Sequence, residues 1–185
     1  MEEVRVWDPR CGEDYTLEDF ETKDVFSSLD KGLQVVEAVG VNWNSENSKG
    51  FLHGLVRLSS VDSLIVVIVP WLNKSVYISA FPKSLKVDYT GPNYILRVDG
   101  NEAVIDQLLS VRESLGGGDS GEWIFIGVSG DELLGDQCLF SDFSRILSCL
   151  DGFEFLIYMA EMHQNFIFTK PSNEVDSSIK AFVEG

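Results

Sequence analysis

The sequence predicts an α+β fold: a single domain, residues 1–185, in which a largely antiparallel β meander is flanked by about four helices. Residues 64–69 are apolar without alternation, which is typical of a strand covered on both faces. Residues 102–115 carry apolar side chains at helical spacing, whereas strand patterns follow one another between residues 33 and 98. A chain of 185 residues can bury a core without disulfides or metal.

Residues 1–30 are expected to form one strand and one helix, which precede the meander. The strand is expected at residues 4–7 and the helix at residues 16–29. Thr16 and Asp19 form a weak capping box, and acids crowd the first turn, as the helix dipole favours. The polar side of this helix is therefore expected to be strongly negative.

The middle third predicts consecutive strands. Polar turn formers at 44–50 predict a hairpin loop, and Gly-Pro-Asn at 91–93 predicts another turn. Pro70 and Pro82 each end a strand. The predicted strands are 33–43, 51–58, 64–69, 76–81, 85–89 and 94–98.

In the last third, helix 102–115 begins after the capping residue Asn101 and ends at the glycines of 116–118. The segment 116–121 is expected to be a mobile surface loop. The remaining predicted elements are a strand at 123–128, a short helix from Ser141 or Asp142 to Gly152, a hairpin of 153–162 with 165–169, and a last helix from Ser172.

The charge is strongly negative and unevenly distributed. Thirty acids and 14 bases give a net charge of -16, with -7 in residues 1–30, +3 in 31–98 and -12 in 99–185. Such an excess of acids disfavours binding to phosphate backbones and to anionic lipid surfaces. The two terminal segments are therefore the candidates for an anionic docking surface, although an acidic exterior also serves solubility.

The compartment is predicted from three absences in the sequence. Cys11, Cys138 and Cys149 form no CxxC pair or disulfide framework, which favours a reducing compartment. Residues 1–14 carry acids where a secretory leader has lysines followed by apolar residues. The longest apolar run is far shorter than the ~20 residues of a spanning helix. We expect a soluble, cytoplasmic protein.

The chemistry-bearing residues match no metal or catalytic motif. His53, expected in a strand, and His163, expected at a hairpin tip, have no zinc-type spacing with the cysteines. The acidic loop at 131–136 lacks the order of a calcium loop. Residues 127–130 lack the GxSxG spacing of a nucleophile elbow. No metal or cofactor is expected.

These observations favour a protein-binding inhibitor of the immunity-protein or antitoxin type, neutralising a basic partner such as a nuclease toxin. Clustered carboxylates can occupy a nucleic-acid site and accelerate association by electrostatic steering. Trp43, at the lip of the expected 44–50 loop, is a candidate interface anchor or else a structural residue. The predicted partner-binding residues are Glu18, Asp19, Glu21, Asp24, Trp43, Asp131, Glu132 and Asp136.

Two alternatives stay open from the sequence. An acidic secretion-type chaperone would be a homodimer that holds an extended client segment by strand addition against an exposed apolar patch. A small hydrolase would need acids, or Cys138 with His53, to converge only in the folded chain.

Overall fold

The computed structural model describes residues 5–8, 13–16, 34–37, 42–43, 45–129, 153–159, 165–170 and 172–184. The helices expected at 16–29 and after Ser141 lie outside these residues, except that Thr16 belongs to a strand.

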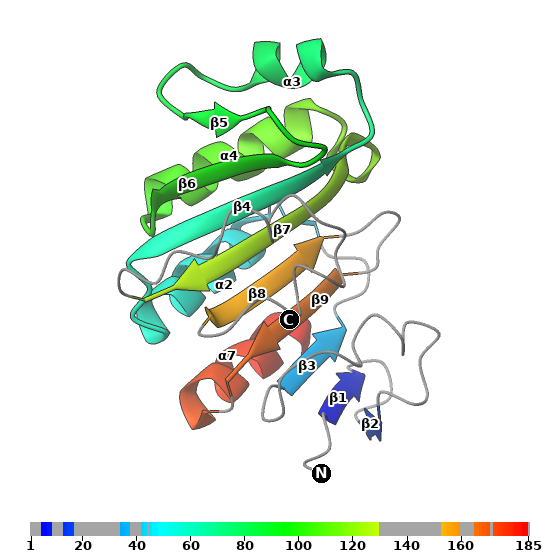
Figure 1. Cartoon of the computed structure of the whole chain (residues 1–185). Coiled ribbons are helices and arrows are strands. Elements are labelled where there is room, and N and C mark those ends of the chain that lie inside the picture. The colour runs from blue at the N-terminus through cyan, green and yellow to red at the C-terminus, as the bar shows by residue number, and fades with distance from the viewer. Residues whose placement is uncertain are drawn as a thin grey trace.

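One nine-stranded sheet runs through the described residues, in the order β2-β1-β3-β9-β8-β7-β4-β6-β5 (Figure 1). Neighbouring strands are antiparallel, apart from the parallel pair β1 and β3. The predicted α+β class is therefore confirmed. The strands are β1 Arg5–Asp8, β2 Glu13–Thr16, β3 Gln34–Glu37, β4 Ser63–Pro70, β5 Val87–Asp88, β6 Tyr94–Asp99, β7 Gly121–Val128, β8 Phe153–Met159 and β9 Asn165–Thr169.

Three helices form a layer on one face of this sheet: α2 (Glu46–Leu58), α4 (Glu102–Ser114) and α7 (Asn173–Glu184) (Figure 1). The short helix α3 (Lys74–Ala80) lies instead at the β5 edge of the sheet. A 3-10 turn, η2 (Gly117–Ser120), connects α4 to β7.

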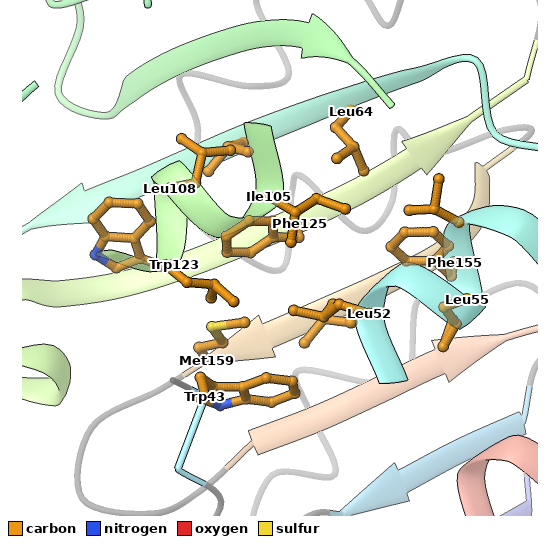
Figure 2. Close-up of a cluster of buried hydrophobic side chains, with 14 of the residues drawn as sticks. Trp43, Leu52, Leu55, Leu64, Ile105, Leu108, Trp123, Phe125, Phe155 and Met159 are labelled. Carbon is orange, nitrogen blue, oxygen red and sulfur yellow. The ribbon is translucent and has the colours of Figure 1, made fainter. Parts of the chain in front are cut away.

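The main core lies between the sheet and the helix layer. Trp123 and Phe125 of β7 face Leu52 of α2 and Leu108 of α4, and all four side chains are at most 1% exposed (Figure 2). The alternate residues of the central strands, such as Ile65 of β4, are also buried. Strand β4 is thus buried on both sides, as its unbroken apolar run predicts.

Several predicted elements are confirmed with nearly the predicted bounds. Asn101 begins α4, and its side chain accepts a hydrogen bond from the Val104 amide at 3.0 Å. Gly116, with φ of 102°, ends that helix in the left-handed conformation that glycine favours. Strand β7, the β8–β9 hairpin and α7 also form where they were expected.

The predicted hairpin of residues 33–58 is wrong, because residues 46–58 form α2. Ser45 caps this helix by accepting a hydrogen bond from the Ser48 amide at 3.1 Å. Phe51, Leu52 and Leu55 then share its buried face, since they recur at helical spacing. Of the strand predicted at 33–43, residues 34–37 form β3 and residues 42–43 are not in a strand, whereas the others lie outside the described residues.

The strand predicted at residues 76–81 is also wrong, because this segment belongs mostly to α3. The buried Tyr77 holds the helix in place, since its hydroxyl donates to the Ser120 carbonyl and accepts from the Trp71 amide. Of the strand predicted at 85–89, only the two residues of β5 form. In the segment predicted as a surface loop, 116–121, Gly116 and Asp119 are exposed, but residues 117–120 form η2, and Ser120 is fully buried and accepts a hydrogen bond from the Trp123 indole.

Candidate functional site

Most residues predicted to bind a partner lie outside the described part of the chain. This holds for the acids of the expected 16–29 helix and of the 131–136 loop. It also holds for four of the five cysteine and histidine residues considered above. The residues concerned are Glu18, Asp19, Glu21, Asp24, Asp131, Glu132 and Asp136, together with Cys11, Cys138, Cys149 and His163.

Trp43 is described, and it is buried inside the fold rather than exposed at a loop. Its side chain is 3% exposed, and its Nε1 donates to Oδ1 of Asn165 at 2.9 Å. Its ring also lies 5.8 Å from that of Phe182, which stacks on Phe51. These contacts tie β9, α7 and α2 together, so Trp43 takes the structural role that was the alternative to an interface anchor.

His53 lies on α2, not in a strand, and contacts α4. Its Nε2 is 3.1 Å from Oδ1 of Asp106, and its Nδ1 is 3.8 Å from Oε2 of Glu102. Arg57, one turn further along α2, places Nη1 3.2 Å from Oε1 of Glu102. Two side chains of α2 are thus joined to two carboxylates of α4, in a group we call the interhelical cluster.

The arrangement of the interhelical cluster favours a structural contact between α2 and α4 over a catalytic centre. A catalytic histidine of the Ser-His-Asp kind directs one ring nitrogen to a nucleophile, whereas both ring nitrogens of His53 face carboxylates. No three His, Cys, Asp or Glu side chains in the described ranges are arranged to hold a metal ion. The carboxylates are about half exposed, so the cluster adds little to stability.

The outward side of the helix layer carries more acids than bases. The first turns of α2, α4 and α7 each contribute acids, where the helix dipole favours negative charge. Of the three bases, Lys49 and Arg57 lie beside Glu46 and Glu102. The acids are Glu46, Glu102, Asp106, Glu113, Glu174 and Asp176, and the bases are Lys49, Arg57 and Lys180.

Arg112, on the last turn of α4, is a basic side chain inside an acidic molecule. The residue is 8% exposed, and its Nε is the one fully buried side-chain nitrogen or oxygen, within the described segments, that lacks a hydrogen-bond partner. Burial lowers the pKa of this guanidinium, an effect that the neighbouring Glu113 charge partly opposes.

Sequence reasoning missed the interhelical cluster and Arg112. The spacing of His53 and Arg57, and that of Glu102 and Asp106, places each pair on one helical face. This signal becomes readable only when residues 46–58 are recognised as a helix. Nothing in the sequence distinguishes Arg112 from an exposed arginine, since its burial depends on tertiary packing.

No helix in the described ranges is both long and apolar enough to cross a membrane. No protein-family model matches the chain, and neither a curated protein nor a solved structure matches it. The function is therefore inferred from the residues and their arrangement.

Proposed function

We propose that this chain is an acidic protein-binding inhibitor, of the immunity-protein or antitoxin type, that neutralises a basic partner such as a nuclease toxin. The observation that carries the proposal is the net charge of -16 together with the surplus of acids on the helix layer. A nuclease carries lysines and arginines where it binds phosphates, and carboxylates can occupy that site in place of nucleic acid.

The helix layer supports the proposal because its acids are exposed and carried on regular elements. The Glu46 side chain is 97% exposed, and Glu102 and Asp106 are about half exposed. Rigid helices hold such charges in a fixed pattern, which lowers the entropy lost on binding. The acids of residues 1–30 and of 131–136 stay candidates for the same surface.

The test begins with purification of the tagged chain from its native host and identification of the bound protein. We expect a basic protein whose association rate, measured with purified components, falls steeply as salt is raised. A rate unaffected by salt, or a bound protein that is not basic, would contradict the proposal.

Charge reversal locates the binding surface. Reversing Glu46 and Glu174 to lysine should slow association about tenfold or more at low salt, because both exposed acids lie on the helix layer. The matched control reverses Asp99 and Asp119, two exposed acids outside the layer, and changes the net charge equally. Equal slowing by both pairs would mean that the helix layer is not the binding surface. Reversal of Glu18, Asp19, Glu21 and Asp24 tests the N-terminal acids in the same assay.

A further inference from the structure

The segment from the end of β4 to the start of β5 differs in charge from the rest of the molecule. Residues 71–87 contain three lysines and no acid, in a chain whose net charge is -16. Lys74 donates a hydrogen bond to the Tyr89 carbonyl at 2.8 Å and lies over the Tyr89 ring. Lys83 and Lys86 are exposed and form no ion pair with any described residue. The segment itself therefore carries a charge of +3, with Asp88 of β5 as the acid that follows it.

The same segment exposes apolar side chains. Trp71 is 42% exposed, Val76 39% and Ile78 53%, and Leu58 is the one other large apolar side chain of the described residues exposed to this extent. Helix α3 turns Tyr77 inward. Successive residues of a helix point about 100° apart, so Val76 and Ile78 flank the buried face. Exposed apolar side chains rimmed by polar residues are typical of a binding surface.

The segment also lies at an edge of the sheet. Among the described strands, β5 is the last of the order and pairs on one side only, through Val87 with Leu96 and Asp88 with Ile95. Figure 1 shows α3 just beyond this strand. The outer side of β5 can receive an extended segment, but two residues supply few backbone hydrogen bonds. Side chains would therefore contribute most of the binding.

We propose that this surface docks a short, extended acidic segment of a partner protein, with apolar side chains between its carboxylates. We call it the basic edge surface; its residues are Trp71, Lys74, Val76, Ile78, Lys83 and Lys86. The acids of the segment would meet the lysines, and its apolar side chains would cover Trp71, Val76 and Ile78. This surface is separate from the acidic helix layer, so its test is independent of the proposed inhibitor function.

Charge complementarity favours a short segment over larger anions. A nucleic acid or an anionic membrane extends beyond the basic edge surface and meets the surrounding acids of a chain with net charge -16. A second copy of the chain brings the same negative charge. At physiological salt, charges more than ~8 Å away are largely screened, so a short segment responds mainly to the lysines beside it.

The experiment uses the full chain and labelled peptides of about ten residues, which span ~33 Å when extended. The main probe alternates glutamate with valine and leucine, in both registers. One comparison peptide replaces the glutamates by glutamine, and another replaces the apolar residues by serine. We expect the main probe to bind at least about tenfold more tightly than either comparison peptide, as measured by fluorescence anisotropy.

Variants locate the binding. Ile78→Ser, and separately Lys83→Glu with Lys86→Glu, should each weaken binding about tenfold. The matched controls are Leu58→Ser, at an exposed apolar residue of α2, and Lys49→Glu with Lys180→Glu on the helix layer. These should change the affinity less than about twofold. Circular dichroism and Tm confirm that each variant is folded.

Four results would overturn the proposal. The first is failure of the main probe to bind at about 1 mM, and the second is equal weakening by edge variants and controls. The third is that oligothymidylate or phosphatidylserine vesicles bind more tightly than the main probe and that Ile78→Ser abolishes this binding. The fourth is a dimer, seen by sedimentation, that Ile78→Ser dissociates, because a second copy would then occupy the surface.

Discussion

At the scale of single residues, Arg112 is a nearly buried guanidinium on which the neighbouring Glu113 charge acts only in part against the effect of burial. Its buried Nε has no hydrogen-bond partner, and removing such a group from water is costly. Arg112→Met keeps the apolar part of the side chain and removes the charge. We expect this variant to raise the free energy of unfolding by about 1 kcal/mol, as measured by urea denaturation.

The control for Arg112→Met is Arg57→Met. The Arg57 side chain is 68% exposed and pairs with a carboxylate at the surface, so its removal should change stability by less than ~0.5 kcal/mol. A clear loss of stability in Arg112→Met would mean that the guanidinium has favourable contacts that its orphaned Nε does not reveal.

Tyr158 on β8 makes stability sensitive to alkaline pH. Burial raises the pKa of this phenol. The negative charge of Glu122, and the hydrogen bond between Tyr158 and Glu122, raise this pKa further. The unfolded phenol ionises near pH 10. The contribution of Tyr158 to stability is therefore complete below about pH 10 and is lost as the pH rises toward the folded pKa.

Urea unfolding between about pH 8 and 11 tests this linkage. We expect the free energy of unfolding to fall with rising pH in the wild type, and to fall less steeply in Tyr158→Phe. Tyr77, whose pKa is also raised by burial, leaves part of the slope in the variant. Parallel curves for the two proteins would show that Tyr158 ionises equally easily in the folded and unfolded chains.

At the scale of elements, the cap of α4 connects a local sequence signal to packing against the sheet. The Asn101 side chain accepts from the Val104 amide at 3.0 Å, and Ile105 and Leu108 are buried one turn later. Asn101→Ala should cost about 1 kcal/mol of stability, measured by urea denaturation. Asn101→Asp, which keeps an acceptor, should restore most of it; equal losses in both variants would show that the cap contributes nothing.

The sequence predicted those elements whose local signals agree with their tertiary environment. Helix α4 has a cap, an apolar stripe and terminal glycines, and β4 has an unbroken apolar run. Both signals are local, so they survive without knowledge of the fold. The α+β class was predicted from the order of the elements, consecutive strands flanked by helices, and it is confirmed although α2 and α3 interrupt those strands.

The failures occurred where local signals were weak or misread. Phe51, Leu52 and Leu55 of α2 have helical spacing, but the polar residues before them resembled a turn. Helix α3 is seven residues long, too short to establish a period, and contains the strand-favouring Val76 and Ile78. The buried Tyr77, which contacts Ser120 from 43 residues away, fixes that helix through a tertiary contact.

The candidate sites were harder to predict than the fold, because they depend on which elements pack together. The interhelical cluster exists because α2 lies beside α4, and the basic edge surface because α3 lies beside β5. The sequence showed the central positive charge, but not that Trp71, Val76 and Ile78 of the same segment are exposed. The surplus of acids was visible in the sequence, whereas its partial location on the helix layer required the structure.

At the scale of the whole molecule, the net charge of -16 acts against folding as well as for association. Like charges repel more strongly in the compact chain than in the unfolded one, and salt screens this repulsion. Raising NaCl from about 0.01 to 0.3 M should therefore raise Tm by a few degrees, since ~1 kcal/mol shifts Tm by about 2–4 °C at this size. Differential scanning calorimetry measures the shift, and a Tm unaffected by salt would show that self-repulsion is negligible.

The two charge-reversed pairs show whether the repulsion comes from the whole surface or from the helix layer. Glu46→Lys with Glu174→Lys reduces the net charge by as much as Asp99→Lys with Asp119→Lys. If the charge acts as a uniform field, both pairs should flatten the salt dependence of Tm equally. A greater flattening by the first pair is expected, because its acids share the helix layer with four others. Only that unequal result is consistent with a concentrated anionic surface of the kind an inhibitor of a basic partner requires.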